Sequence, residues 1–206
     1  MPADQDIQRV IEFWFGPLDD RGMAQPAYSS RWWVSTPEFD QLIDDQFGEL
    51  NRRALAGDLT HWLVGPEGYL AQIILLDQFS RNLYRGTGEA FGGDERARAI
   101  AGDAVAQQFH LQLPPPYACF LLMPFIHGEE LASQEQGAQL FAELGKQLAD
   151  DHPLQGMVSG MLSSAKDHRE IIERFGRFPH RNQALGRTST PDEIAYLGDG
   201  GRRFGQ

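Results

Sequence analysis

Apolar residues recur every three or four positions along most of this 206-residue chain, which is the spacing of one face of an α-helix. Near the start, one such stripe is formed by Ile7, Val10, Ile11, Trp14 and Phe15. Asp4 stands before the stripe and can cap a helix, whereas Gly16-Pro17 stands after it and stops one. We therefore predict a first helix between these two points.

Capping residues and prolines divide the rest of the chain into further helices. These predicted helices begin, in order, at Thr36-Pro37, near Pro66, at Asp94, at Pro114-Pro115-Pro116, at the capping box Ser133-Gln134-Glu135-Gln136, at Pro153 and at the capping box Thr190-Pro191-Asp192-Glu193. The second ends at Gly57 and the third near Leu83. Residues 17–35 are predicted to be irregular, with Trp32 and Trp33 anchoring this segment to the body.

The fifth predicted helix is apolar on nearly all sides, which places it at the centre of the molecule. It contains Pro124, which we expect to kink or break it just before Phe125. No stretch alternates polar and apolar residues for long enough to predict a strand. The fold is therefore predicted to be all-α, a right-handed stack of antiparallel helical hairpins, and residues 1–206 are expected to form a single domain.

Charge and cysteine usage narrow the class of protein. The net charge of −11 argues against binding of nucleic acid, although residues 166–187 carry six Lys/Arg against three acids. Cys119 is the single cysteine, which fits a reducing compartment, so a cytoplasmic protein is expected. The longest apolar run, from Tyr117 to Ile126, is far shorter than the ~18 residues of a membrane span, so no membrane partner is expected.

Polar side chains replace aliphatic ones at the end of the third predicted helix. Asp77 and Arg81 continue the stripe that Ile73 and Ile74 define, and Gln78 and Asn82 repeat the same four-residue spacing beside them. These four side chains could form one wall of a ligand site. The alternative is an ion pair within the helix that covers an edge of the core.

Two histidines stand at positions where chemistry is plausible. His168 lies on the inward stripe of the seventh predicted helix, and His127 follows Pro124 and precedes Glu129. A histidine on an apolar face can also be a satisfied core residue. Pairing with Asp77 or Glu129 would raise the pKa of His168, whereas burial alone would lower it, and we predict the raised pKa.

The turn after Phe175 concentrates polar groups that could bind a ligand: Arg177, His180, Arg181 and Asn182. Its arginines could hold a carboxylate or phosphate with two hydrogen bonds, or they could bridge acids and carbonyl groups of the acidic body. The chain has no phosphate-binding glycine loop, no GxGxxG after a strand, no GxSxG and no HExxH. The paired ExxH motifs of di-iron bundles are also missing, so we predict no metal and no cofactor.

We expect the polar side chains at helix ends to converge on one partly buried pocket, formed by Asp77, Arg81, His127, Glu129, His168, Arg177, His180 and Arg181. The leading hypothesis is binding of a small anionic ligand. Under it, His127 or His168 performs acid/base chemistry, Asp77 or Glu129 orients the imidazole, and Arg81, Arg177 or Arg181 holds the charge. The alternative is a helical-repeat scaffold that binds a peptide or a partner protein, with the oligomeric state left open.

Several motifs resemble those of the bacterial domain-of-unknown-function family numbered 924. They are Phe13-Trp14-Phe15-Gly16, Asp77-Gln78-Phe79-Ser80-Arg81-Asn82, Pro124-Phe125-Ile126-His127-Gly128-Glu129, His168, Phe175 to Asn182, Gly186-Arg187, Thr190-Pro191 and Glu193. The resemblance spans about residues 5 to 197 and implies a fold similar to tetratricopeptide-type helical hairpins. Gly128 stands where the family usually has serine, so no role for a hydroxyl is carried over. The resemblance supplies no catalytic residue, because the family has no assigned reaction.

Overall fold

The computed structural model describes residues 2–34 and 36–204, and for residues 2–4 it describes the backbone alone. The described chain contains no β-strand, which confirms the predicted all-α class. Its α-helices are α1 (Pro2–Phe15), α2 (Pro26–Ser29), α3 (Pro37–Ala56), α4 (Pro66–Ile73), α5 (Ser80–Leu83), α6 (Asp94–Ala106), α7 (Pro115–His127), α8 (Leu131–Gln147), α9 (Gln155–Phe175) and α10 (Pro191–Gly198). A π-helical segment, Ile74–Phe79, joins α4 to α5 without a break.

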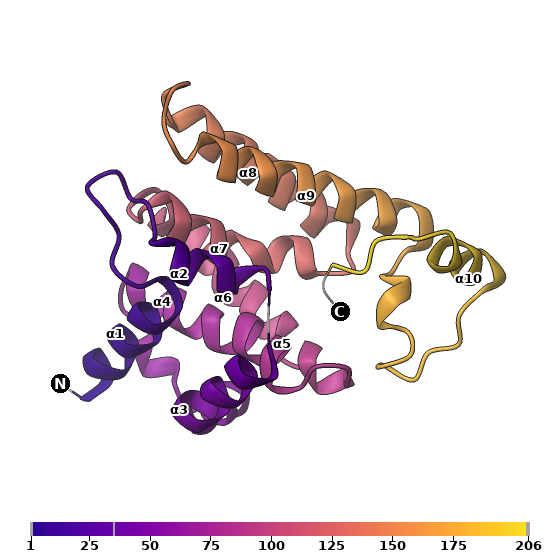
Figure 1. The fold of residues 1–206 in the computed structure, drawn as a ribbon, viewed down its shortest axis with the longest axis horizontal. Helices are drawn as coiled ribbons and strands as arrows, with labels where there is room; N and C mark the ends of the chain where they lie inside the picture. Colours follow the sequence, from indigo (N-terminus) through magenta and orange to yellow (C-terminus); the bar gives the residue numbers. More distant parts are fainter. Residues whose placement is uncertain (1, 35, 205–206) are drawn as a thin grey trace.

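Consecutive helices pack against one another through the second half of the chain. The helix α6 contacts α7, α7 contacts α8, and α8 lies alongside α9 at one edge of the molecule (Figure 1). In the first half, α1 packs on α4, while α3 packs on the π-helical segment and α5. This arrangement is compatible with the predicted stack of helical hairpins.

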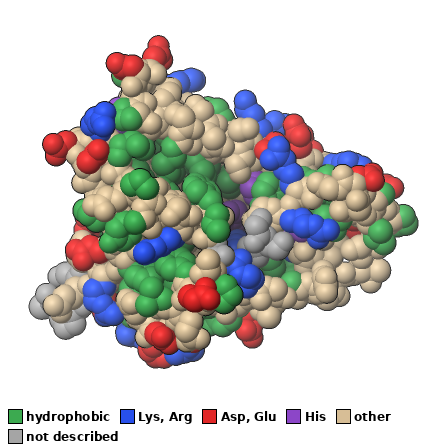
Figure 2. Space-filling view, in the orientation of Figure 1, with side chains coloured by type: hydrophobic (Ala, Val, Ile, Leu, Met, Phe, Trp, Pro, Cys, Tyr) green, Lys and Arg blue, Asp and Glu red, His purple; other side chains and the backbone are tan. Residues whose placement is uncertain are grey.

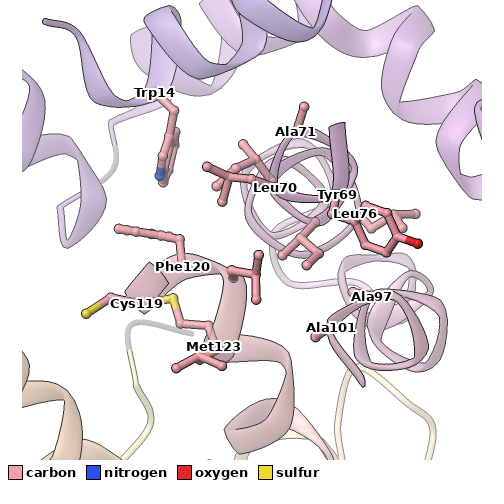
Figure 3. Packing of buried hydrophobic residues seen from close by; sticks show 14 of the residues in the cluster. Trp14, Tyr69, Leu70, Ala71, Leu76, Ala97, Ala101, Cys119, Phe120 and Met123 are labelled. Atoms are coloured by element: carbon pink, nitrogen blue, oxygen red, sulfur yellow. The ribbon is translucent and has the colours of Figure 1, made fainter. Parts of the chain in front are cut away.

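The central position of α7 is confirmed. Its residues from Ala118 to Ile126 are buried, and it contacts α4, α6, α8 and α9. Phe120 of α7 meets Trp14 of α1 edge to face, with ring centroids 5.7 Å apart, in a core that continues through Leu70 and Ala101 (Figure 3). A fully buried aromatic side chain stabilises a fold by about 2–3 kcal/mol, so this contact contributes substantially to the position of α1.

Helix ends with strong local signals lie where they were predicted. The Thr36 hydroxyl accepts a hydrogen bond from the Phe39 N–H and begins α3, and Gly57 ends it with a φ of 89°. Thr190 and Glu193 form the predicted capping box of α10. Each of these signals acts within one helical turn, so no distant residue is needed to produce it.

Several boundaries differ from the prediction. The helix α1 already begins at Pro2, and a capping bond from the Asp4 side chain lies outside the described residues. The helix α7 is not broken by Pro124 and continues to His127, since a proline removes only one helical hydrogen bond. The helix α9 begins at Gln155, two residues after Pro153. The segment 17–35 contains the short helix α2 and a 3₁₀ turn, Ser30–Trp32.

The predicted capping roles of Ser133 and Asp94 are wrong. The Ser133 hydroxyl donates to the carbonyl oxygen of Phe125 over 2.7 Å, because α8 starts earlier, at Leu131. Asp94 is the first residue of α6 and caps nothing; its carboxylate binds arginines. None of the described helices combines the length and hydrophobicity that crossing a bilayer requires.

Candidate functional site

The π-helical segment Ile74–Phe79 carries Asp77 and Gln78, between α4 and α5. A π-helical turn has a wider backbone than an α-helix and recurs at functional sites. Asp77 is fully buried, and the Gln78 side-chain amide donates to its Oδ2 over 2.5 Å. The intrahelical ion pair of Asp77 with Arg81, foreseen as one alternative, is present at 3.3 Å.

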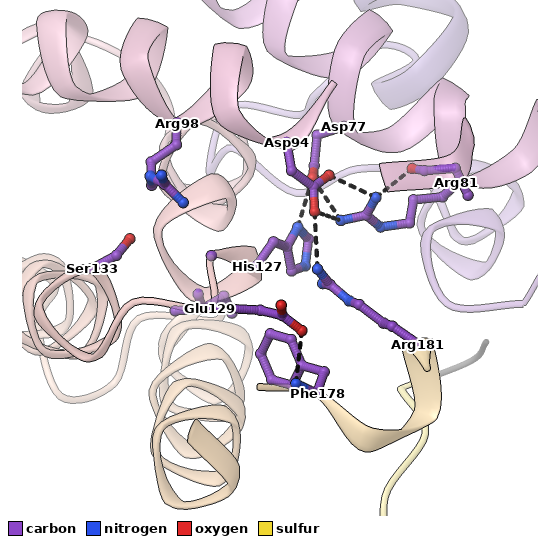
Figure 4. Close-up of polar contacts among 12 residues, drawn as sticks. Asp77, Arg81, Asp94, Arg98, His127, Glu129, Ser133, Phe178 and Arg181 are labelled. Carbon is purple, nitrogen blue, oxygen red and sulfur yellow. Dashed lines mark hydrogen bonds and ion pairs between the residues drawn. The ribbon is translucent and has the colours of Figure 1, made fainter. Parts of the chain in front are cut away.

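Asp77 also forms a hydrogen bond with His127, the last residue of α7. Nδ1 of His127 lies 2.7 Å from Oδ1 of Asp77 (Figure 4). Burial alone would raise the pKa of Asp77, but the neighbouring His127 and Arg81 hold it well below its ordinary value. An ionised carboxylate only accepts hydrogen bonds, so Nδ1 of His127 carries a proton toward Asp77. In the neutral form of the ring, Nε2 is the atom with the lone pair.

Asp94 joins two buried arginines into one network. Its Oδ1 lies 2.8 Å from Arg81, and its Oδ2 lies 3.1 Å from Arg81 and 3.1 Å from Arg181 (Figure 4). The Arg181 guanidinium also lies 4.5 Å from the ring centres of both Phe91 and Phe178. Burial and then the nearby Arg81 lower the pKa of Arg181 to about 10. The charge of Arg181 is therefore balanced inside the protein by Asp94.

His168 lies close to His127 but has no acidic partner among the described residues. The two ring centroids are 6.1 Å apart, and Nδ1 of His168 lies 2.7 Å from the carbonyl oxygen of Ser164. Burial, followed by the neighbouring His127, lowers the pKa of His168 to about 3. The prediction of a raised pKa is therefore wrong, because Asp77 pairs with His127.

The remaining predicted residues fasten the turn after α9. Glu129 accepts two hydrogen bonds from Arg187, at 2.6 and 2.9 Å, and one from the backbone N–H of Phe178 at 2.8 Å. Arg177 binds Glu193 with two hydrogen bonds, at 2.7 and 2.8 Å. Hydrogen bonding from Arg177 is the main reason that the pKa of Glu193 falls to about 2. These contacts match the alternative in which the arginines of this turn bridge acids and carbonyl groups.

Asn182 and His180 also belong to this turn. The Asn182 amide donates to Glu193 and to the Ser189 hydroxyl, both over 3.1 Å. The His180 ring lies beside that of Phe178, and burial lowers its pKa to about 3. The structure thus brings Asp77, Arg81, His127 and His168 together. In contrast, Glu129, Arg177 and Asn182 form hydrogen bonds that stabilise the turn after α9.

A cavity of about 290 Å³ lies against this histidine pair. Its apolar lining consists of Trp14, Trp32, Trp33, Val34, Met123, Ile126, Met161 and Phe204. Its polar lining consists of Arg31, Gln78, Arg81, Asn82, Arg85, His127, Ser164 and His168. Figure 2 shows a hollow near the middle of this face, where hydrophobic side chains meet histidine and cationic side chains.

The charged side chains of the cavity wall are positive. Its charged residues are three arginines, and no aspartate or glutamate of the described chain lines it. Arg85 pairs with Asp40 and Arg81 pairs with Asp77 and Asp94. The Arg31 guanidinium instead lies over the rings of Tyr28 and Phe39, at 5.2 and 5.4 Å, without a carboxylate partner in the described structure.

Sequence reasoning missed several cavity residues. The sequence suggested Trp33 as an anchor of the segment 17–35, but it did not indicate that Trp33 or Phe204 lines the cavity. Both positions depend on how this segment and the chain after α10 fold back (Figure 1). Met123 and Met161 belong to the hydrophobic core and also line the cavity. Within the described ranges, no three His, Cys, Asp or Glu side chains are grouped so that they could hold a metal ion.

Comparison with other proteins identifies the family. No curated protein matches the chain. The solved structure of a protein of unknown function from Agrobacterium tumefaciens is similar, with a TM-score of 0.80 and 31% sequence identity over 96% of this chain and 99% of that one. The family model described as bacterial protein of unknown function (DUF924) matches residues 10–201. The chain therefore belongs to this bacterial family of unknown function.

Proposed function

We propose that the protein binds a small organic anion in this cavity and that His127 takes a proton from it. The observation that carries the proposal is the hydrogen bond of 2.7 Å between buried Asp77 and His127, whose ring lines the cavity. A buried carboxylate fixes the imidazole tautomer and stabilises the imidazolium that forms after proton transfer. This pairing suits His127 to act as a general base.

The charge of the wall supports an anionic ligand. The net charge of the chain is −11, yet the charged groups lining the cavity are Arg31, Arg81 and Arg85. Arg31 is the best candidate for a direct ion pair, because it has no carboxylate partner among the described residues. An arginine without a counter-ion beside a cavity favours a carboxylate or phosphate on the ligand.

The size and lining of the cavity support a small ligand over a peptide. A volume of about 290 Å³ is close to the lower end for small-molecule sites, which begin at about 300 Å³. Three tryptophans, Trp14, Trp32 and Trp33, offer flat apolar surface for the uncharged part of the ligand. A peptide-binding scaffold would need an extended groove, so the small-ligand hypothesis takes precedence.

Binding is tested by a panel of carboxylated and phosphorylated metabolites. The three cavity tryptophans allow each titration to be followed by intrinsic fluorescence, with thermal shift as the second readout. We expect Arg31→Gln to weaken binding roughly tenfold or more. The matched control is Arg52→Gln, which removes an exposed arginine on α3 that is outside the cavity lining. A panel without any binder, or equal affinities in both variants, would refute anion binding.

Proton transfer is tested separately with whichever ligand binds. NMR in D₂O follows conversion of the ligand and exchange of its carbon-bound protons. We expect His127→Gln to abolish both processes while it changes affinity by less than about threefold, since a general base acts mainly in the transition state. Binding without any His127-dependent conversion or exchange would leave a binding protein and refute the role of His127.

A further inference from the structure

His168 has a fixed tautomer. Its Nδ1 lies 2.7 Å from the carbonyl oxygen of Ser164, one turn earlier on α9. A carbonyl oxygen only accepts hydrogen bonds, so Nδ1 of His168 must carry the proton. Burial also lowers the pKa of this imidazole to about 3, which leaves it neutral near pH 7. Its Nε2 is therefore a hydrogen-bond acceptor.

The ring of His168 is held in one orientation. It stacks on Phe204 with centroids 3.6 Å apart, and it meets Phe178 edge to face at 5.5 Å. A flip of the ring would turn a C–H group toward the Ser164 carbonyl oxygen and lose the hydrogen bond. Packing and hydrogen bonding thus keep Nε2 on the side of the ring opposite Ser164.

No donor of the described chain satisfies Nε2 of His168. His168 is 5% exposed and lines the cavity, but its hydrogen-bond partners, the Ser164 carbonyl oxygen and the Ser164 hydroxyl, are both at Nδ1. A ligand group in the cavity that donates to this unpaired acceptor therefore gains a hydrogen bond that the described chain does not supply. The ring centroid of His127 lies 6.1 Å from that of His168, and its Nδ1 is already engaged by Asp77.

From these contacts we infer that the ligand carries a hydroxyl group beside its negative charge, and that this hydroxyl donates to Nε2 of His168. Arg31 of the wall lacks a carboxylate partner among the described residues and can bind an anionic acceptor, whereas the imidazole needs a donor. An anion with an O–H group meets both requirements. The ligand class is therefore hydroxycarboxylates or protonated phosphates. His168 is then the residue that selects for the hydroxyl, an inference that rests on the proposed anion binding.

An ammonium group could also donate to an imidazole, but the cavity disfavours it. Among the residues that the structure describes, the charged side chains lining the cavity are all arginines, and the acids Asp77 and Asp94 are outside its lining. A ligand cation would meet these arginines before any carboxylate. A hydroxyl donates without adding positive charge, so it fits the site better than an amine.

The test uses pairs of anions that differ by one O–H group: inorganic phosphate against sulfate, lactate against propionate, and mandelate against phenylacetate. Affinities are measured by calorimetry and by saturation-transfer NMR in buffer with a chelator. For the wild type we expect the hydroxyl-bearing member of each pair to bind roughly tenfold or more tightly, because the other member leaves Nε2 of His168 unpaired.

His168→Phe should abolish this preference, since phenylalanine keeps an aromatic ring against Phe204 but lacks the acceptor. The control His61→Phe changes an exposed histidine outside the cavity lining and should keep the preference. His168→Gln provides a second variant if the first does not fold. An ¹⁵N NMR spectrum that assigns the proton to Nδ1 of His168 checks the tautomer in the wild type itself.

The outcomes separate this inference from the proposed function. Equal binding of both members of each pair in the wild type overturns the inference and leaves anion binding intact. A preference that survives in both His168 variants overturns the assignment to His168. If no anion of the panel or of the pairs binds, the proposed function is refuted, and the inference that rests on it is refuted as well.

Discussion

Replacing Asp94 with alanine removes the carboxylate that two buried arginines share. Asp94 accepts hydrogen bonds from Arg81 at 2.8 and 3.1 Å and from Arg181 at 3.1 Å. The side chains of Arg81 and Arg181 are only 11% and 7% exposed, so water cannot replace the lost carboxylate easily. The variant would leave two like charges near each other without this counter-ion.

The expected loss of stability is large for a single substitution. Breaking a buried ion pair by removing one partner costs about 3–5 kcal/mol, against about 0–1 kcal/mol for an exposed pair. Asp94 is itself 14% exposed, which keeps the expectation in the range for buried pairs. For a chain of this length the melting temperature should fall by about 10 °C.

Urea unfolding followed by tryptophan fluorescence measures this loss. The matched control is Glu95→Ala, because Glu95 is the next residue in the first turn of α6 and is exposed. Both substitutions lose a favourable interaction with the helix dipole, so their difference isolates the arginine contacts. A cost within about 1 kcal/mol of the control would refute the reasoning. A double-mutant cycle with Arg181→Leu should show coupling, since that substitution removes one of the uncompensated charges.

Three further predictions address burial elsewhere in the chain. Burial lowers the pKa of His168 to about 3, so below pH ~6.5 the wild type loses about 1.4 kcal/mol of folding stability per pH unit. His168→Leu lacks this titrating group, so the urea midpoints of the wild type and the variant should converge from pH 7.5 to pH 5. Burial raises the pKa of the Cys119 thiol to about 12, so iodoacetamide at pH 8 should label it, by mass spectrometry, only after unfolding in urea. A Cβ at Gly68 would lie 1.9 Å from the Trp62 carbonyl oxygen, so Gly68→Ala should lower the urea midpoint strongly, whereas Gly102→Ala, with nothing within 4 Å, should raise stability by about 0.5–1 kcal/mol.

Local signals in the sequence predicted the helices well, but the partners of polar residues were harder to predict. Thr36 and Thr190 cap helices as expected, because the groups that they bind lie three residues away. Ser133 and Asp94 are residue types that also cap helices, yet their partners are Phe125 and two arginines. A capping residue and a residue in a tertiary contact look the same in sequence, and only the packing of helices separates them.

The candidate site could be predicted only in part, because the sequence indicates which positions face inward but not which side chains pair. Asp77 and His168, which the sequence places on apolar stripes, are buried. His127, singled out because it follows Pro124, lines the cavity. The sequence could not decide which histidine Asp77 holds, since that depends on how α7 meets the π-helical segment Ile74–Phe79. Its error about the pKa of His168 follows directly, because the histidine without the acid is governed by burial.

The arginines of the turn after α9 differ from Arg31 in whether they bind a carboxylate. Arg177, Arg181 and Arg187 each bind a carboxylate and so hold the turn after α9 in place. Arg31 stands at the cavity and has no such partner in the described structure. Under the proposed function, an anionic ligand would find a donor on Arg31 and an acceptor on Nε2 of His168. That division of donors and acceptors is the reason to look for an anion with a proton to give, and to look for its binding at Arg31 before the arginine-rich turn.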